Sequence, residues 1–145
     1  MKRLLSVVAI ALLSLSATSI AGAQENIATY ACQEVGSNST EPLAGDESHR
    51  LKVVDYSCLV TAGPMSGGLG TGRDVYEKEA TGNRLLMGGG VIRKPGATAV
   101  YVMTDEGHGH YVLAVGGAAS LSDKSFTLTE KENGTGLFSI VEKLQ

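Results

Sequence analysis

Four tyrosines are the side chains of this sequence best suited to bind a small molecule. A tyrosine offers an apolar ring and a hydroxyl that donates or accepts a hydrogen bond. The chain has tyrosines on five different segments of β-strand character: Tyr30 and the four candidates Tyr56, Tyr76, Tyr101 and Tyr111. If they face inward together, they line a cavity suited to a small apolar ligand. The alternative is a packed core without a cavity, and the sequence leaves both interpretations open.

Asp55 is the second candidate, because it interrupts an otherwise apolar segment over residues 51–62. A carboxylate buried there needs a cationic partner, and Arg73, Arg84 and Arg93 are available. Such a pair is either structural or part of a ligand site. The composition of the segment favours the structural role.

His108 and His110 are two residues apart, which places both imidazoles on the same side of a strand. Such a pair binds zinc or copper when a third ligand is near, and His49 is the remaining histidine. The sequence therefore offers a metal site at His108, His110 and His49. The alternative is that these polar residues collect in a glycine-flanked turn for solvation alone.

No motif of a known catalytic site supports an enzyme. The chain has no Gly-x-Ser-x-Gly elbow that would expose a nucleophilic serine. The glycine-rich stretch ends in Gly72, Arg73 and Asp74, whereas a phosphate-binding loop requires Lys followed by Ser or Thr. We therefore expect no cofactor and favour a non-catalytic protein.

Cys32 and Cys58 are the two cysteines of the chain and are expected to form a disulfide. A redox-active pair is usually separated by two residues, and this pair is not. In the chain-entropy model, closing a loop of this length stabilises the fold by about 3 to 4 kcal/mol.

The N-terminus has the parts of a secretory signal peptide. Lys2 and Arg3 precede an apolar run, which is followed by small residues up to Ala23. We expect residues 1–23 to be removed, the remaining chain to be secreted or periplasmic, and no integral membrane segment to remain after cleavage. A formal net charge of −3 argues against binding to nucleic acid.

The elements that would position these residues are short strands separated by turns. Strands are expected over residues 26–33, 51–62, 97–105, 110–115, 126–132 and 137–143, with further short strands between 74 and 94. The polar stretch 34–49 is predicted to be a long loop. The glycine-rich stretch 63–72 is predicted to be a loop that folds over an opening, and Gly88, Gly89 and Gly90 to be a sharp bend.

This pattern predicts an all-β fold in one domain, residues 24–145. We expect a small antiparallel β-barrel of about eight strands in up-and-down order, because nearly every connection is short. The alternative is a two-sheet β-sandwich. In length, leader and strand pattern the chain resembles the small secreted barrels of the lipocalin and allene oxide cyclase type, a likeness of architecture that implies no particular function.

These features favour a secreted or periplasmic, non-catalytic barrel that binds a small apolar molecule in its interior. One alternative is an envelope-associated interaction module that binds another protein through its loops or through a basic surface that includes Arg93 and Lys94. The other is a metal-binding protein or enzyme that uses His108 and His110.

Overall fold

The computed structural model describes residues 27–79 and 81–145, with the backbone alone for residues 27, 37–41, 43 and 47. The expected signal peptide, residues 1–23, lies outside the described residues. Its cleavage therefore stays a prediction.

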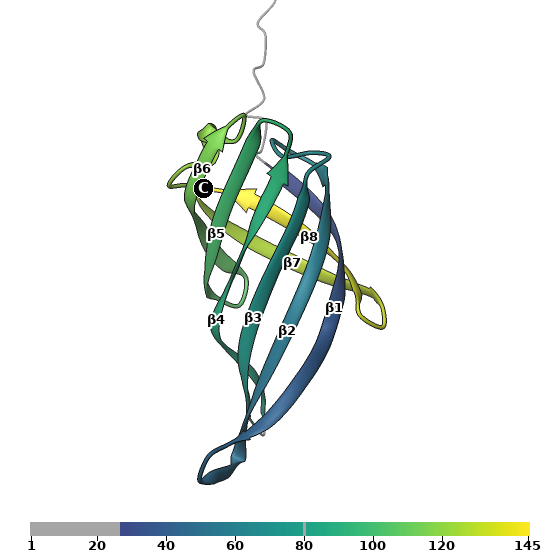
Figure 1. Ribbon diagram of the computed structural model, residues 1–145, viewed down its shortest axis with the longest axis vertical. Helices are drawn as coiled ribbons and strands as arrows, with labels where there is room; N and C mark the ends of the chain where they lie inside the picture. The colour runs from purple at the N-terminus through teal and green to yellow at the C-terminus, as the bar shows by residue number, and fades with distance from the viewer. Residues whose placement is uncertain (1–26, 80) are drawn as a thin grey trace, which may run out of the picture.

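Eight antiparallel strands form one closed barrel, in which each strand pairs with its neighbours in the sequence (Figure 1). The strands are β1 (Ile27–Leu43), β2 (Asp46–Ala62), β3 (Leu69–Glu79), β4 (Gly82–Lys94), β5 (Ala97–Asp105), β6 (His108–Gly116), β7 (Ser125–Gly134) and β8 (Leu137–Leu144). The predicted all-β, up-and-down barrel is confirmed, and the sheet does not divide into the two layers of a sandwich.

The barrel closes where β1 pairs with β8, with Tyr30 opposite Ile140 and Cys32 opposite Phe138. Closure pairs the first and last strands with each other, whereas β6 and β7 pair over His108, Gly109 and His110 alone. A single 3₁₀ turn, Ala119–Leu121, lies between β6 and β7. Among the described residues no helix is long and apolar enough to cross a membrane.

The predicted loop over residues 34–49 is wrong. β1 and β2 form a long hairpin in which Glu34 pairs with Tyr56 and Glu41 with Leu51. Its tip extends beyond the lower end of the barrel in Figure 1. Polar side chains concealed this hairpin from sequence analysis, because backbone hydrogen bonds hold a strand pair whether or not the side chains are apolar.

The bend predicted at Gly88, Gly89 and Gly90 is also wrong, because all three lie within β4 and pair with β3 and β5. Likewise, the predicted loop 63–72 ends early, since β3 begins at Leu69. Glycines in β3 and β4 leave room for neighbouring side chains that point into the barrel. A methyl group at Gly72 would overlap the ring of Tyr56, and one at Gly88 would overlap the carboxylate of Asp74. Glycine on the inner face thus makes room for large inward-facing side chains.

One end of the barrel, the upper end in Figure 1, is packed with apolar side chains. Met65, in the loop between β2 and β3, is 1% exposed, and Leu121 in the 3₁₀ turn is 2% exposed. Both belong to the same buried cluster as Val60, Ala97 and Ala118. This end is therefore closed by side chains from two loops.

Candidate functional site

The interior of the barrel encloses a cavity of about 460 Å³. This volume lies within the range of about 300 to 1,000 Å³ that is usual for small-molecule sites. The aromatic lining residues are Tyr30, Tyr56, Tyr76, Tyr101, Phe126 and Phe138. The aliphatic ones include Val54, Leu85, Ile92, Met103, Leu128 and Ile140. The cavity therefore has a largely apolar wall, contributed by all but β6 of the eight strands.

The lining residues that are exposed to solvent are Glu34, Asn83, Glu106 and Glu130. Glu106 and Gly107 form the turn between β5 and β6, at the end of the barrel opposite Met65. The cavity thus opens at the end away from the glycine-rich loop. We had expected residues 63–72 to fold over the opening; they close the other end instead.

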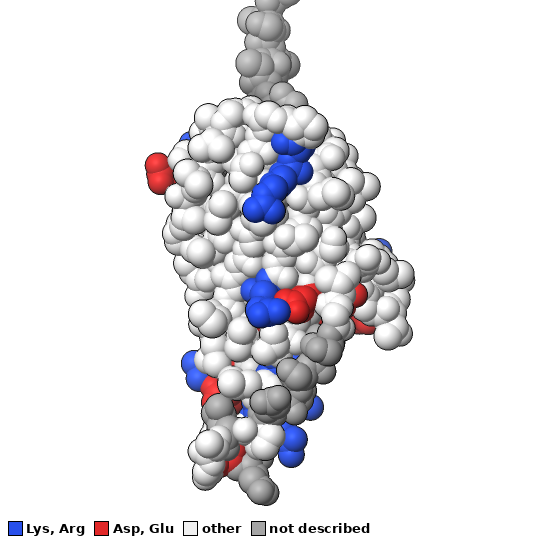
Figure 2. Space-filling view, in the orientation of Figure 1, with Lys and Arg blue, Asp and Glu red and all other residues white. Residues whose placement is uncertain are grey.

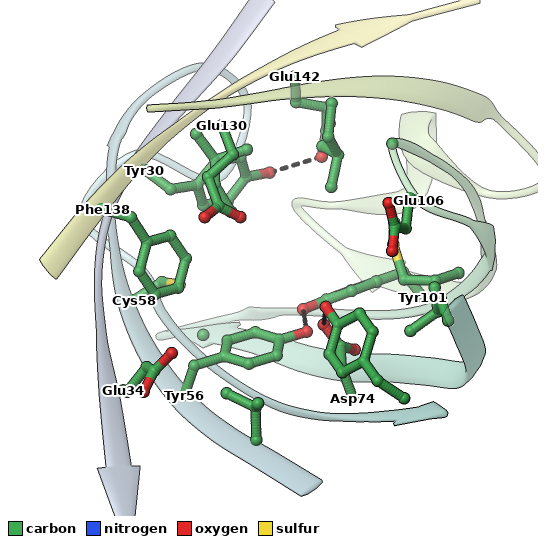
Figure 3. A pocket seen from close by; sticks show the side chains of 18 of the residues that line it. Tyr30, Glu34, Tyr56, Cys58, Asp74, Tyr101, Glu106, Glu130, Phe138 and Glu142 are labelled. Atoms are coloured by element: carbon green, nitrogen blue, oxygen red, sulfur yellow. Dashed lines mark hydrogen bonds between the residues drawn. The ribbon is translucent and has the colours of Figure 1, made fainter. Parts of the chain in front are cut away.

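Asp74, on β3, is the least satisfied polar group of the cavity. Its Oδ2 accepts a hydrogen bond of 3.3 Å from the hydroxyl of Tyr76, but its buried Oδ1 makes no hydrogen bond of standard geometry. Burial raises the pKa of Asp74 to about 6, although the hydroxyls of Tyr76 and Tyr56 and the backbone of Gly89 lower it. Figure 3 shows Asp74 on the same side of the cavity as Tyr56 and Tyr101.

The hydroxyls of Tyr56 and Tyr101 are 2.9 Å apart and share a hydrogen bond above Asp74. Burial raises the pKa of Tyr101 to about 12 and raises that of Tyr56 further. Both phenols therefore remain neutral at physiological pH. They supply hydrogen-bonding groups on an otherwise apolar wall.

A second polar cluster lies deeper in the barrel. Glu142, 3% exposed, accepts hydrogen bonds from the hydroxyl of Tyr30 at 2.9 Å and from that of Tyr111 at 3.0 Å. Burial raises the pKa of Glu142, and the two hydroxyls lower it. Because both of its oxygens are partnered, this carboxylate is suited to joining β1, β6 and β8.

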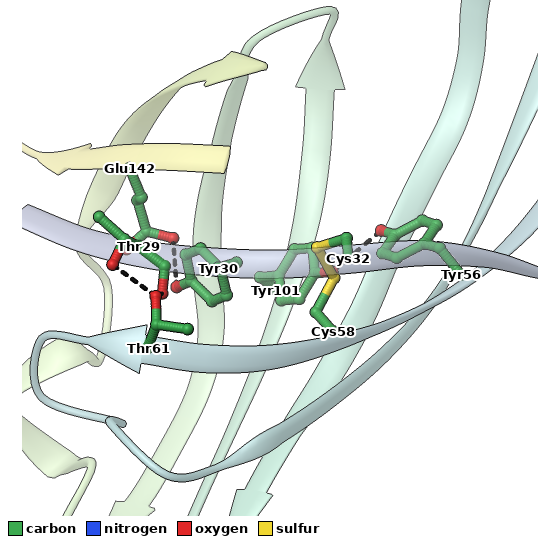
Figure 4. Close-up of a disulfide and its surroundings, with 8 residues drawn as sticks. All are labelled: Thr29, Tyr30, Cys32, Tyr56, Cys58, Thr61, Tyr101 and Glu142. Atoms are coloured by element: carbon green, nitrogen blue, oxygen red, sulfur yellow. Dashed lines mark hydrogen bonds between the residues drawn. A yellow bond between two sulfur atoms is a disulfide. The ribbon is translucent and has the colours of Figure 1, made fainter. Parts of the chain in front are cut away.

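The disulfide between Cys32 and Cys58 is confirmed, with an S–S distance of 2.02 Å. The two cysteines face each other across β1 and β2, and Cys58 lines the cavity. Figure 4 shows the bond between the rings of Tyr30 and Tyr56. The disulfide links β1 and β2 covalently on the inner face of the barrel.

The structure brings three of the four predicted tyrosines together: Tyr56, Tyr76 and Tyr101 line the cavity. Tyr111 is 1% exposed and packs against Phe126 at a ring-centroid distance of 5.2 Å, without lining the cavity itself. It contributes to the cavity wall by holding Glu142.

Asp55 does not belong to the cavity. Its side chain lies on the outer face of β2, where it accepts hydrogen bonds of 2.6 and 2.9 Å from Arg73 on β3. The guanidinium group holds the pKa of Asp55 below its usual value. We had expected a buried carboxylate with a cationic partner. The partner is one of those expected, but the pair faces outward because Val54 and Tyr56 take the inner face.

Sequence analysis missed Glu142 and Asp74 as interior polar groups, whereas Tyr30 was among the tyrosines expected to face inward. Strand alternation carries the missing signal: Glu142 lies two residues from Ile140, and Asp74 two residues from Tyr76. Each shares its face with an apolar or aromatic residue. Neither assignment was possible until the strand registers were known.

His49 lies on β2, whereas His108 and His110 both lie on β6. The Nδ1 atom of His49 is 2.6 Å from Asp46, and the Nδ1 atom of His108 is 2.6 Å from Asp105. His110 pairs with Val102 and Ser125 in the sheet. Over the described ranges, no group of three or more His, Cys, Asp or Glu side chains is arranged to hold a metal ion.

The outer wall is sparsely charged on the face shown in Figure 2, with basic side chains toward the upper end and mixed charges toward the lower end. Arg93 is exposed, and Lys94 donates a hydrogen bond of 2.9 Å to the carbonyl of Pro64. Lys94 thus helps to fix the loop that closes the barrel. Lys94, one of the two residues of the expected basic interaction surface, therefore also has a structural role.

Comparison with known proteins adds no assignment to this site. No protein-family model matches the chain, and neither a curated protein nor a solved structure matches it. The function is therefore argued from the geometry alone.

Proposed function

We propose that this protein is a non-catalytic binding protein whose barrel interior holds a small, largely apolar molecule. The observation that carries the proposal is the cavity of about 460 Å³, lined by aromatic and aliphatic side chains and open at one end. Apolar surface that is left facing a hydrated cavity is unfavourable, and a ligand that displaces this water gains the hydrophobic free energy.

The hydroxyls of Tyr56 and Tyr101 and the carboxylate of Asp74 supply the polar contacts that would orient such a ligand. A few placed polar groups on an apolar wall are typical of small-molecule sites. A catalytic role is less favoured, since the serine that contacts a histidine, Ser48 beside His49, is exposed and does not line the cavity. The most deeply buried carboxylate, Glu142, is held by two tyrosine hydroxyls.

The test is the binding of 1-N-phenylnaphthylamine, an uncharged apolar dye whose fluorescence rises in an apolar site. We expect saturable binding of one dye molecule per chain. Replacing Leu85, which lines the cavity, with Trp should reduce the dye affinity at least tenfold. Replacing the neighbouring Leu86, which is 45% exposed, with Trp should leave it unchanged.

Circular dichroism would establish that both tryptophan variants are folded. Absence of dye binding to the wild-type protein would overturn the proposal, and so would equal binding by the two variants. Native mass spectrometry of protein purified from the compartment in which it accumulates would then identify the natural ligand by its added mass.

The proposed site of action is outside the cytoplasm, either in the periplasm or in the medium. The disulfide supports this location, since such bonds persist in oxidising compartments. The N-terminal pattern that ends at Ala23 supports it as well. Cell fractionation with N-terminal sequencing tests it. A cytoplasmic protein that retains Met1 would refute it.

A further inference from the structure

The carboxyl groups of the cavity are the starting point for an inference about its ligand. Of the described lining residues, five are acidic: Glu34, Asp74, Glu106, Glu130 and Glu142. One, Lys52, is basic. Repulsion from Glu34 and Glu132, together with burial, raises the pKa of Glu130. The cavity and its mouth therefore carry more carboxyl groups than basic groups.

Within this group, Asp74 lacks a compensating charge. Among the described residues no Lys, Arg or His forms an ion pair with it, and its buried Oδ1 lacks a standard hydrogen bond. By contrast, Glu142 is satisfied by Tyr30 and Tyr111. Because the groups that hydrogen-bond to Asp74 are neutral, a cationic group beside it would compensate its charge and would gain more there than in water.

The surroundings of Asp74 favour a cation of a particular kind. The Tyr76 hydroxyl donates to Asp74, and the hydroxyls of Tyr56 and Tyr101 meet in the same cavity. Aromatic rings attract ammonium groups to their faces. The rest of the wall, including Ile92 and Met103, suits an apolar body.

The mouth of the cavity adds a second, longer-range preference. Glu34, Glu106 and Glu130 are its exposed acidic residues. Charge of one sign lining a cleft with low-dielectric walls concentrates ions of the opposite sign. Cationic molecules would therefore be drawn toward the opening, and anionic ones would be repelled.

We propose that the ligand is an organic cation, an amine or quaternary ammonium group joined to an apolar body, with its charged group beside Asp74 and the tyrosine rings. This inference rests on the proposed function, because it names the ligand class of the same cavity. A neutral ligand would leave the charge of Asp74 without a compensating cation. An anionic ligand would meet five carboxyl-bearing residues and a single lysine.

The experiment compares benzyltrimethylammonium with neopentylbenzene, its uncharged carbon isostere, as competitors that displace 1-N-phenylnaphthylamine. We expect the cation to bind the wild-type protein at least tenfold more tightly than the isostere. Asp74→Asn should abolish most of this preference without weakening the isostere. Asp55→Asn, which neutralises the outward-facing carboxylate, should keep the preference.

The outcomes separate the two proposals. If the dye binds but the isostere competes as well as the cation, the cation proposal is overturned and the apolar cavity stands. Retention of the full preference in Asp74→Asn would overturn the role of Asp74. If the dye fails to bind at all, the proposed function fails, and the cation proposal fails with it.

Discussion

The hydroxyl of Tyr30 donates a hydrogen bond of 2.9 Å to Oε2 of Glu142, and the two residues are 112 positions apart in the chain. Tyr30 lies on β1 and Glu142 on β8, so this bond joins the first and last strands from inside the barrel. Tyr111 of β6 donates to the same carboxylate at 3.0 Å. The cluster thus reinforces the closure that the β1–β8 backbone pairing provides.

Removing one hydroxyl from this cluster should destabilise the barrel. We expect Tyr30→Phe to lower the free energy of unfolding by about 1 to 3 kcal/mol, because a buried charged acceptor loses one of its two donors. Urea denaturation measures the change. Tyr76→Phe, which removes a longer bond of 3.3 Å to Asp74, should have a smaller effect. Equal losses in both variants would contradict the role assigned to Glu142.

Asp74 should make stability depend on pH. Its pKa is raised from 3.8 to about 6, so the folded state holds this proton more tightly than the unfolded state does. The contribution of Asp74 to stability is therefore largest below pH 4 and is lost as the pH rises to about 6.

Asp74→Asn should remove that dependence. At pH 7 we expect the variant to be more stable than the wild type by about 1 to 2 kcal/mol, after allowing for solvent screening, and the difference should vanish near pH 4. Glu130 and Glu142 also have raised pKa values, so the difference between the two proteins is the informative quantity. Parallel stability curves from pH 4 to pH 7 would show that Asp74 is not destabilised by burial.

Opening the disulfide should lower stability substantially. We expect Cys32→Ala with Cys58→Ala to lower the free energy of unfolding by about 3 to 4 kcal/mol, from the entropy of the freed loop and some lost packing. Reductant should destabilise the wild-type protein and leave the double variant unchanged. Insensitivity of the wild-type protein to full reduction, verified by mass, would contradict this expectation.

Two glycines on the inner face of β3 provide a matched test of the space argument. Gly72→Ala should lower stability by about 1 to 3 kcal/mol, because the new methyl group would overlap the buried ring of Tyr56. Gly70→Ala places its methyl group 3.6 Å from the Cβ atom of Cys58, an ordinary contact, and should stay within about 1 kcal/mol of the wild type. Thermal unfolding of the two variants measures the contrast, and a tolerated Gly72→Ala would disprove the argument.

The fold class followed from the sequence because its signals are local. Short apolar segments separated by turn residues predict strands and hairpins, and many short connections favour an up-and-down barrel. Cys32 and Cys58 were paired correctly because no other cysteine competes.

The interior of the site was harder to predict because it depends on register between distant strands. Gly72 and Gly88 lie in glycine-rich stretches that are typical of a loop or bend. That they leave room for the side chains of Tyr56 and Asp74 becomes visible only when strands β2, β3 and β4 are aligned. Asp55 and Asp74 are both acids within strands, yet one faces outward and the other inward. Strand register decides between these orientations, and local sequence does not.

The closure of one end by Met65 and Leu121 determines the route by which a molecule can enter and leave the cavity. A barrel that is closed at one end and open at the other is not a channel. A molecule that enters the cavity must leave through the same opening. The proposed ligand would therefore be bound and released at one end of the barrel, and it would not cross from one end to the other. Glu34, Glu106 and Glu130 at the mouth would control both its arrival and its release.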